Sequence, residues 1–296
     1  MNIAELNKIA IAMVTPGKGI LAADESSGTI KKRFDSIGVE STEDNRRDYR
    51  EMLFRAETAM KEHISGVILY DEPSLQKAKD GTPLVTLIER AGSIPEAGGA
   101  VDQGGDKGAV ALAGAPGEKV TDGLDGLRER LKEYHGLGAR FAKWRAVIDI
   151  GRGGDRAIPS RYCLVANAHA LARYAALCQE AAIVPIVEPE VLMDGDHDIS
   201  RCYEVTEAAL RLLYEALYEH RVALEGTILK PNMVIPGKLS GKPASPSEIA
   251  ERTVRCFRAA VPAAVAGTGF LSRGQSNGEA AAQFNPLNAE KTRPLP

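Results

Sequence analysis

Short apolar runs alternate along the chain with longer segments whose apolar residues recur at helical spacing. We predict strands over residues 19–25, 66–73, 97–110, 139–150, 183–190, 224–234 and 264–272. The third is the weakest, because its segment is rich in glycine and alanine. Helices are predicted over 46–60, 123–138, 165–181, 200–220 and 247–260, with Gly136 and Gly138 as a stop signal and Ser245 or Ser247 as a start. Such alternation is typical of a parallel sheet wound by βα units.

The order of these elements predicts the fold class. No predicted turn from strand to helix carries the GxGxxG pattern, which favours an α/β barrel of the (β/α)8 type over a doubly wound open sheet. Neither an internal repeat nor a linker interrupts the chain, so we predict a single domain over 1–296. Residues 93–119 fit the alternation poorly and resemble a long loop or a poorly formed third strand. The last residues, NAEKTRPLP, stand where a closed barrel would still need its eighth strand.

The composition favours a small-molecule partner. Of the 296 residues, 44% are hydrophobic and 26% are charged, and the formal net charge is −3. A balance so close to neutral gives no reason to expect a nucleic-acid or membrane partner.

The cysteines and the N-terminus predict a reducing, cytoplasmic setting. The first residues lack the apolar core and cleavage site of a secretory leader, and no stretch approaches the roughly 20 apolar residues of a membrane span. The cysteines stand singly, without a CxxC pair, so we interpret them as reduced core thiols. They are Cys163, Cys178, Cys202 and Cys256.

Charged residues gather at the predicted ends of the strands. In a parallel barrel these ends meet at one mouth, and alternate residues of a strand share one face. FAKWR thus presents two cations on one face, and VEPE presents two carboxylates. Because an unpaired buried charge costs free energy, so many charges indicate chemistry. The charged strand-end residues are Asp24, Asp71, Glu72, Lys143, Arg145, Glu188, Glu190 and Lys230.

Each of these residues also has a purely structural interpretation. Lys230 could be a surface lysine that extends to solvent, and Lys143 could form a structural ion pair with a carboxylate of VEPE. Asp24 and Glu25 could cap a helix that starts nearby. Against this, Pro231 stops the strand directly after Lys230 and fixes the backbone there, which favours a specific role for this lysine.

Together the charges have the logic of an imine-forming site. A lysine amine attacks a ketone only when it is neutral, and a second cation nearby or a desolvating pocket lowers a lysine pKa toward that state. Lys143 would be the cation beside Lys230. Asp24, Glu188 and Glu190 would move protons. A protonated imine is itself an electron sink, so this chemistry needs neither a metal nor a cofactor.

Candidate anion sites accompany these charges. Arg145, Lys32 and Arg33 supply cations. The segment FLSRGQS after the seventh predicted strand offers Ser272, Gly274 and backbone N–H groups, at a place where barrels commonly bind phosphate. Alternatively, this segment is a polar turn before a helix.

These motifs, in their order, closely resemble those of class I fructose-bisphosphate aldolases. The resemblance covers nearly the whole chain. It implies a (β/α)8 barrel, usually a homotetramer, that cleaves fructose 1,6-bisphosphate into dihydroxyacetone phosphate and glyceraldehyde 3-phosphate in glycolysis and runs the reverse reaction in gluconeogenesis. The motifs are LAADESSGTIKKR, FAKWR, LARYA, VPIVEPE, GDHD, LEGTILKPNMV and FLSRGQS.

The resemblance also implies a role for each catalytic candidate. Lys230 would form the Schiff base, and Glu188 would be the general acid and base for imine formation. Asp24 would orient the substrate and assist carbon–carbon cleavage. Lys143 would supply the charge that tunes Lys230, and Glu190 would support either lysine.

The same resemblance implies the phosphate-binding residues. Arg145 would meet a phosphate, and Ser272 with Gly274 would hold the phosphate of the ketone half. Lys107 matches a lysine that lies near the active site in the family. The region after the first strand matches the site of the other phosphate, with Ser26, Thr29, Lys32 and Arg33.

The chain departs from the family pattern in three places. Arg273 replaces the first glycine of the family's SGGQS, where a side chain can disfavour the backbone conformation near phosphate, although an arginine could also add a contact. Residues 93–108 do not align cleanly with the family's third strand. The family's eighth strand, with its SYGRALQ segment, and its C-terminal tail with a tyrosine have no counterpart here. A complete polypeptide of this length would have an open seam and reduced activity.

Two alternatives remain at this point. A metal-dependent enzyme on the same fold would need ligands clustered at strand ends, and among the histidines His197 in DGDHD is the one in an acidic loop. A catalytically impaired, aldolase-like scaffold or interaction protein would explain Arg273 and the missing strand. The joint presence of the charged catalytic candidates argues against the scaffold.

Overall fold

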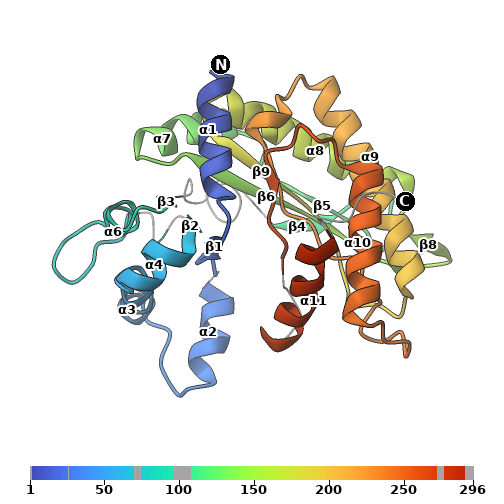
Figure 1. Cartoon of the computed structure of the whole chain (residues 1–296), viewed down its shortest axis with the longest axis horizontal. Helices are drawn as coiled ribbons and strands as arrows, with labels where there is room; N and C mark the ends of the chain where they lie inside the picture. Colours follow the sequence, from blue (N-terminus) through green and yellow to red (C-terminus); the bar gives the residue numbers. More distant parts are fainter. Residues whose placement is uncertain are drawn as a thin grey trace.

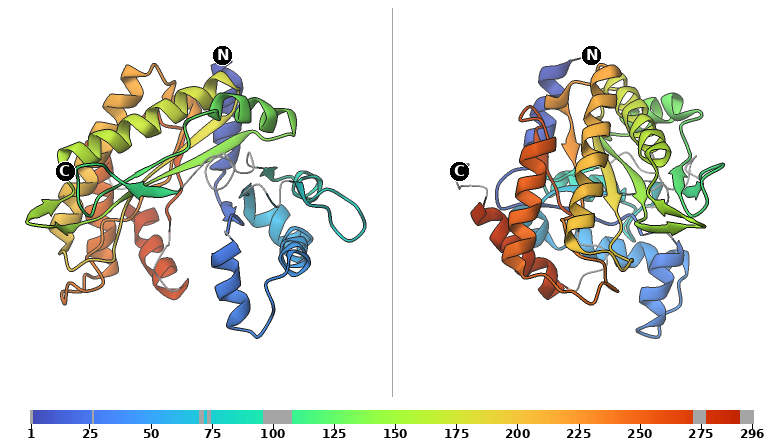
Figure 2. Two further views of the ribbon diagram at one scale, coloured as in Figure 1. Left: turned by 180° about the vertical axis from the view of Figure 1, so that it is seen from behind. Right: turned by 90° about the vertical axis from the view of Figure 1, so that its right-hand side faces the viewer.

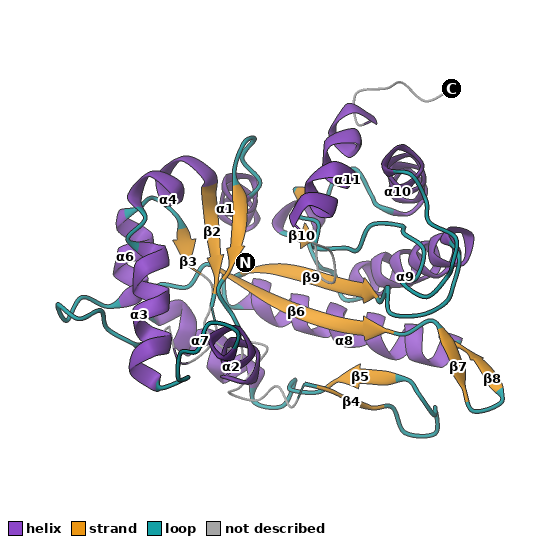
Figure 3. Cartoon of the chain, turned by 90° about the horizontal axis from the view of Figure 1, so that it is seen from below, coloured by secondary structure: helices purple, strands orange, loops and turns teal. Residues whose placement is uncertain are grey.

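Two parallel sheets form the framework of the protein (Figures 1 and 3). The computed structural model describes residues 2–25, 27–69, 72, 75–95, 108–271 and 277–290. The first sheet has the order β1-β2-β3 and the second has the order β11-β10-β9-β6, and all neighbours within them are parallel. These strands span Gly19–Ala22 (β1), Ile64–Ile68 (β2), Ile94–Pro95 (β3), Phe141–Ile148 (β6), Val184–Val191 (β9), Ile228–Leu229 (β10) and Gly267–Thr268 (β11).

A hydrogen bond joins the two sheets where β3 meets β6. The Arg140 N–H donates to the Pro95 carbonyl at 3.4 Å. The parallel strands therefore follow one another in chain order, from β1 to β11, across both sheets. The predicted α/β class with parallel strands is confirmed.

One apolar core lies between the two sheets and is covered at one end by α1 (Ile3–Met13). The side chain of Asn2 caps this helix by accepting a hydrogen bond from the Glu5 N–H at 3.2 Å. Residues of α1 pack against inward-facing residues of β2, β6, β9 and β10, with β1 and β3 adding partly buried ones. The buried members are Leu6, Ala10, Met13, Ile68, Phe141, Val184, Ile186 and Ile228.

Gly226 shows how closely α1 approaches the rest of the chain. A Cβ atom at this position would lie 2.9 Å from Leu6 Cβ, a distance that real Cβ atoms essentially never show. The glycine therefore permits the contact between α1 and the short 3-10 helix η1 (Leu224–Gly226). This packing holds η1 directly before β10.

Three of the helices on the outer side of the second sheet begin at capping residues. They are α8 (Arg161–Glu180), α9 (Ile199–Glu219) and α10 (Pro246–Ala260). Helices α8 and α9 cover β6 and β9, α10 packs on α9, and α7 (Leu127–Gly136) packs on α8 (Figure 2). Ser160, Asp198 and Ser245 each accept a hydrogen bond from a first-turn N–H. Of the two start signals proposed from the sequence, Ser245 is the cap. The helices predicted over 123–138, 165–181, 200–220 and 247–260 are confirmed.

The helices beside the first sheet differ from the prediction. They are α2 (Ser27–Asp35), α3 (Glu43–Phe54), α4 (Glu57–His63) and α6 (Leu84–Arg90). The single helix predicted over 46–60 is wrong, because the chain leaves the helical conformation at Ala56 (φ −73°, ψ 71°). This break lets Met60 of α4 join the core under β2.

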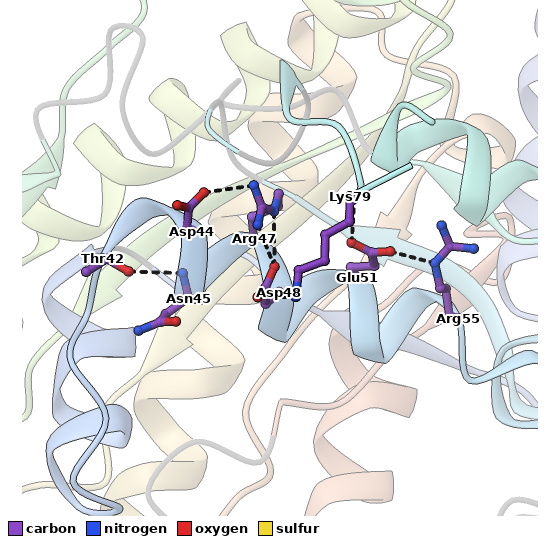
Figure 4. Close-up of polar contacts among 8 residues, drawn as sticks. All are labelled: Thr42, Asp44, Asn45, Arg47, Asp48, Glu51, Arg55 and Lys79. Atoms are coloured by element: carbon purple, nitrogen blue, oxygen red, sulfur yellow. Dashed lines mark hydrogen bonds and ion pairs between the residues drawn. The ribbon is translucent and has the colours of Figure 1, made fainter. Parts of the chain in front are cut away.

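The outer face of α3 is tied to the turn that precedes α6 (Figure 4). Lys79 bonds Asp48 at 2.7 Å, and its backbone N–H donates to Glu51 at 2.9 Å. Arg55 bonds Glu51 at 2.7 Å and Asp80 at 2.6 Å. These contacts fix the turn after β2 against α3.

The weak third strand predicted over 97–110 lies mostly outside the described residues, which exclude 96–107. The strand beside β2 is β3, which precedes the predicted range. Ala109 and Val110 belong instead to β4 (Ala109–Ala111), which pairs antiparallel with β5 (Lys119–Thr121). A second hairpin, β7 (Gly151–Gly153) with β8 (Arg156–Ile158), extends β6 and was not predicted.

Two further findings complete the fold. Helix α11 (Asn277–Glu290) packs on α10 through Phe270, which stacks on Phe257 with ring centroids 5.5 Å apart, and through the buried Leu287. The four cysteines are free and buried, as predicted. In the part of the chain that the structure describes, no helix combines the length and apolarity needed to cross a membrane.

Candidate active site

A cavity of about 1160 Å³ lies between the two sheets, lined by residues along their strands and directly beyond them. It receives side chains from β1, α2, β6, β9 and β10. Eight of the residues proposed from the sequence line it, namely Asp24, Thr29, Arg33, Lys143, Arg145, Glu188, Glu190 and Lys230. The structure therefore brings together charges that are up to 206 positions apart in the chain.

Lys230 stands at the end of β10 beside a carboxylate of β9. Its N–H donates to the Val187 carbonyl at 2.9 Å, and the backbone ladder with β9 ends here because Pro189 has no N–H to donate in return. The Lys230 Nζ atom lies 3.2 Å from Glu188 Oε1. Glu188 is buried, and its Oε2 atom accepts no hydrogen bond from the described residues. An amine and a carboxylate that can exchange a proton thus face the cavity together.

Lys143 pairs with Asp24 across the cavity. The distance from Lys143 Nζ to Asp24 Oδ2 is 3.0 Å, although β6 and β1 belong to different sheets. Burial raises the pKa of Asp24, but the charges of Lys143 and Lys230 and the hydrogen bond from Lys143 outweigh burial, so that the pKa lies below its ordinary value of 3.8. Asp24 is therefore a carboxylate, held in place by a buried cation.

The structural interpretation of Lys143 expected an ion pair with a carboxylate of VEPE. Lys143 bonds Asp24, and Lys230 bonds Glu188 of VEPE. The charge that Lys143 meets comes from the opposite sheet, which no local pattern in the sequence indicates.

Arg145 and Glu190 form a third ion pair at the mouth. The Arg145 Nε atom donates to Glu190 Oε2. Arg145 is also fixed through its backbone, because Thr121 of β5 donates to its carbonyl at 2.6 Å. Glu190, which was expected to support a lysine, bonds the arginine that was expected to meet a phosphate.

Helix α2 contributes the other predicted phosphate residues unequally. Thr29 and Arg33 are four positions apart and share the face that lines the cavity. Lys32 lies about 100° around the helix from Arg33. It is exposed and is not part of the cavity lining. Ser26, Lys107, Ser272 and Gly274 lie outside the described residues, as does Arg273.

Sequence reasoning treated Glu25 only as a helix cap, but it lines the cavity. It is 8% exposed, its Oε1 atom accepts from Arg33 at 2.5 Å, and its Oε2 atom is buried without a hydrogen bond from the described residues. The Glu25 carbonyl accepts from the fully buried Arg50 at 3.2 Å. The position of Glu25 beside Asp24 was a signal that could have identified it, whereas nothing in the sequence around Arg50 marks it as buried.

The candidate metal ligand lies elsewhere. His197 is buried in the loop between β9 and α9 and does not line the cavity, and burial lowers its pKa. Within the described ranges, no three His, Cys, Asp or Glu side chains gather closely enough to hold a metal ion.

Comparisons with known proteins identify the family. The family model described as "Glycolytic: Fructose-bisphosphate aldolase class-I" matches residues 5–295. A "Probable fructose-bisphosphate aldolase class 1" of Xanthomonas campestris is 56% identical over 296 residues, which cover 100% of this chain and 85% of that protein. "Fructose-bisphosphate aldolase 6, cytosolic" of Arabidopsis thaliana is 54% identical over 98% of this chain and 77% of its own length.

A solved structure gives the same answer for the fold. Fructose-bisphosphate aldolase from Plasmodium falciparum, solved in complex with TRAP and a small-molecule inhibitor, superposes with a TM-score of 0.90 at 44% identity, over 99% of this chain and 81% of that chain. The resemblance seen in the motifs is thus confirmed, and the chain belongs to the class I fructose-bisphosphate aldolase family.

Proposed function

We propose that the cavity cleaves fructose 1,6-bisphosphate reversibly through an imine on Lys230. As a class I aldolase, the chain is a glycolytic lyase. The observation that carries the mechanism is the pairing of Lys230 with Glu188 at 3.2 Å beside the pairing of Lys143 with Asp24 at 3.0 Å, all four lining one cavity.

Imine formation needs a proton acceptor at the amine. Glu188 takes a proton from Lys230, and the neutral amine attacks the ketone carbon of the open-chain sugar. The carbinolamine then loses its hydroxyl as water, with Glu188 returning the proton to that oxygen. The product is a protonated imine whose nitrogen is that of Lys230.

Cleavage needs a base on the other side of the cavity. Asp24 is ionised, because its pKa lies below 3.8, and it would take the proton from the hydroxyl next to the bond that breaks. The electron pair of that bond moves into the protonated imine, which leaves an enamine and releases the aldehyde. Protonation of the enamine and hydrolysis of the imine release dihydroxyacetone phosphate and restore Lys230.

The cations at the mouth would receive the two phosphates. Arg33 and Arg145 each hold a carboxylate, Glu25 and Glu190 respectively, and a phosphate would compete for these guanidinium groups. Thr29 stands beside Arg33 on the cavity face of α2. Contacts from Ser26, Lys32, Lys107, Ser272 and Gly274 remain predictions.

The remaining properties are proposed by resemblance. The strand order, parallel from β1 to β11, supports a (β/α)8 barrel in which a further strand between β11 and β1 would complete the wall. We propose one such domain over 1–296, assembled as a homotetramer. A cytoplasmic location is supported by the Arabidopsis relative named as cytosolic. The substrates are small sugar phosphates.

Replacing the lysine tests the proposal. Lys230→Met should lower the turnover of fructose 1,6-bisphosphate by about 10⁴-fold or more, because the nucleophile is lost. Lys238→Met is the control, since Lys238 is also paired with a carboxylate, Asp194 at 3.2 Å, but does not line the cavity. Turnover that survives Lys230→Met, or that falls equally in Lys238→Met, would contradict the assignment.

A further inference from the structure

A buried asparagine follows Lys230 in the segment that leaves β10. Asn232 is 4% exposed and does not line the cavity, so it cannot meet the substrate there. All of its side-chain polar atoms are nevertheless bonded. The Oδ1 atom accepts from the Val191 N–H at 3.0 Å, and the Nδ2 atom donates to Thr206 Oγ1 at 3.2 Å and to the Met233 carbonyl at 3.0 Å.

The bond to Val191 continues a ladder that the backbone cannot continue. Strands β9 and β10 are paired up to Leu229 with Val187, and the Lys230 N–H still reaches the Val187 carbonyl. Pro231 faces β11, since its carbonyl accepts from the Leu271 N–H at 3.2 Å, and on β9 Pro189 has no N–H to donate toward β10. Two residues after Lys230, the amide oxygen of Asn232 takes the place of a backbone carbonyl and accepts from the end of β9.

The two links form a frame around the reacting groups. On β9, Val187 and Val191 are the linked residues, and both Glu188 and Glu190 lie between them. On the other strand, the two linked positions are Lys230, through its backbone N–H, and Asn232, through its side chain. The amine and the carboxylate 3.2 Å apart are therefore held by bonds on both sides.

A third contact fixes the amide itself. Thr206 is 2% exposed and belongs to α9, which packs on the outer side of the sheet. Its hydroxyl accepts from Asn232, so the amide group cannot rotate without losing a buried hydrogen bond. The helix thereby sets the orientation of the oxygen that holds β9.

We propose that Asn232 is a positioning residue for the lysine imine: by joining Val191 and Thr206 it holds Lys230 at the distance from Glu188 that proton transfer requires. The proposal rests on the imine function of Lys230. Small displacements matter here, since a misplacement of about 1 Å can cost about 10²-fold in rate.

The experiment compares two buried asparagines. Asn232→Leu removes the amide that bonds Val191 and Thr206 and replaces it with an apolar side chain of similar size. Asn167→Leu is the matched control, because Asn167 is 2% exposed and its Nδ2 atom donates to the Lys119 and Cys163 carbonyls at 2.9 and 3.0 Å, on α8 and outside the cavity lining. Both changes should lower the unfolding temperature. The rate of imine formation with dihydroxyacetone phosphate, trapped by borohydride, separates them.

We expect Asn232→Leu to slow imine trapping by about 10-fold to 10²-fold and to lower kcat more than it changes KM. Asn167→Leu should leave the trapping rate within about 2-fold. An unchanged trapping rate in Asn232→Leu, or an equal loss in Asn167→Leu, would overturn the positioning role. An adduct missing from the native protein as well would instead overturn the imine function, and the proposal with it.

A second pair of variants covers the case in which Asn232→Leu does not fold. Thr206→Val keeps the shape of the side chain and removes the acceptor for the Asn232 amide. Thr253→Val is its control, since Thr253 is buried and its hydroxyl also bonds this segment, accepting from the Val234 N–H at 2.9 Å. Among the described residues, Thr253 has no hydrogen bond to Asn232. A slower imine step in Thr206→Val alone supports the proposal, and equal rates in the two variants contradict it.

Discussion

At the scale of single residues, three ion pairs organise the site, and they differ in what they connect. Lys230 with Glu188 joins neighbouring strands, as does Arg145 with Glu190. Lys143 with Asp24 joins the two sheets. The last pair therefore couples the base proposed for cleavage to the strand that faces it across the cavity.

This coupling predicts a change in pH dependence. Lys143→Met removes a positive charge that holds the pKa of Asp24 down, while burial continues to raise it, so the acid limb of kcat/KM should move to higher pH. Lys119→Met is the control, because Lys119 pairs with Asp149 at 3.4 Å outside the cavity lining. An acid limb that stays in place in Lys143→Met would show that Asp24 is not the group that titrates.

The same pKa makes a statement about stability. Because the folded-state pKa of Asp24 is below the unfolded value near 3.8, its ionised form favours the folded state. That contribution is fully present above pH 3.8 and is lost as the pH falls through the folded-state value. Acid unfolding of Asp24→Asn should therefore show a weaker pH dependence in this range than acid unfolding of the native protein.

At the scale of elements, the sequence predicted what local patterns determine. The longest strands, β6 and β9, are nearly continuous buried runs, and the long helices α8 to α10 begin at clear caps, so these elements were found. The strand β3 has two residues, too few to carry an apolar pattern of its own. Its place is set by pairing with β2, which the sequence around it does not indicate. For the same reason, the bonds of Asn232 to Val191 and Thr206 were not predictable, since these partners lie 41 and 26 positions away. The partners of Arg50 lie 22 and 25 positions away.

The cap of α10 offers a test at this scale. Ser245→Ala should lower the free energy of unfolding by about 1 kcal/mol, because the Glu248 N–H at 3.2 Å loses its acceptor. Ser247→Ala should change it by less than about 0.5 kcal/mol, since Ser247 is an exposed residue inside the same first turn. Equal effects of the two changes in urea unfolding would contradict the capping role.

At the scale of the whole molecule, the shared core between the sheets makes the site a product of the entire chain. Leu6 of α1 packs with Phe141 of β6 and Ile228 of β10, and Ile20 of β1 packs against the same cluster. The strands that carry Lys143 or lead into Asp24 and Lys230 thus meet through one set of apolar contacts.

Truncating this core should therefore affect stability strongly. Leu6→Ala should cost about 2–5 kcal/mol, because Leu6 is 1% exposed. On the same helix, Ile11 is 54% exposed, and Ile11→Ala should cost less than about 0.5 kcal/mol. Urea unfolding measures both, and a small loss for Leu6→Ala would mean that α1 contributes little to the core.

The central claim is that Lys230 captures the substrate ketone, and one measurement tests it directly. The protein is incubated with dihydroxyacetone phosphate, reduced with borohydride, digested and analysed by peptide mass spectrometry. We predict a reduced adduct on Lys230 and none on Lys143, although both lysines line the cavity. An adduct on another lysine, or no adduct in the folded protein, would contradict the imine mechanism proposed for this chain.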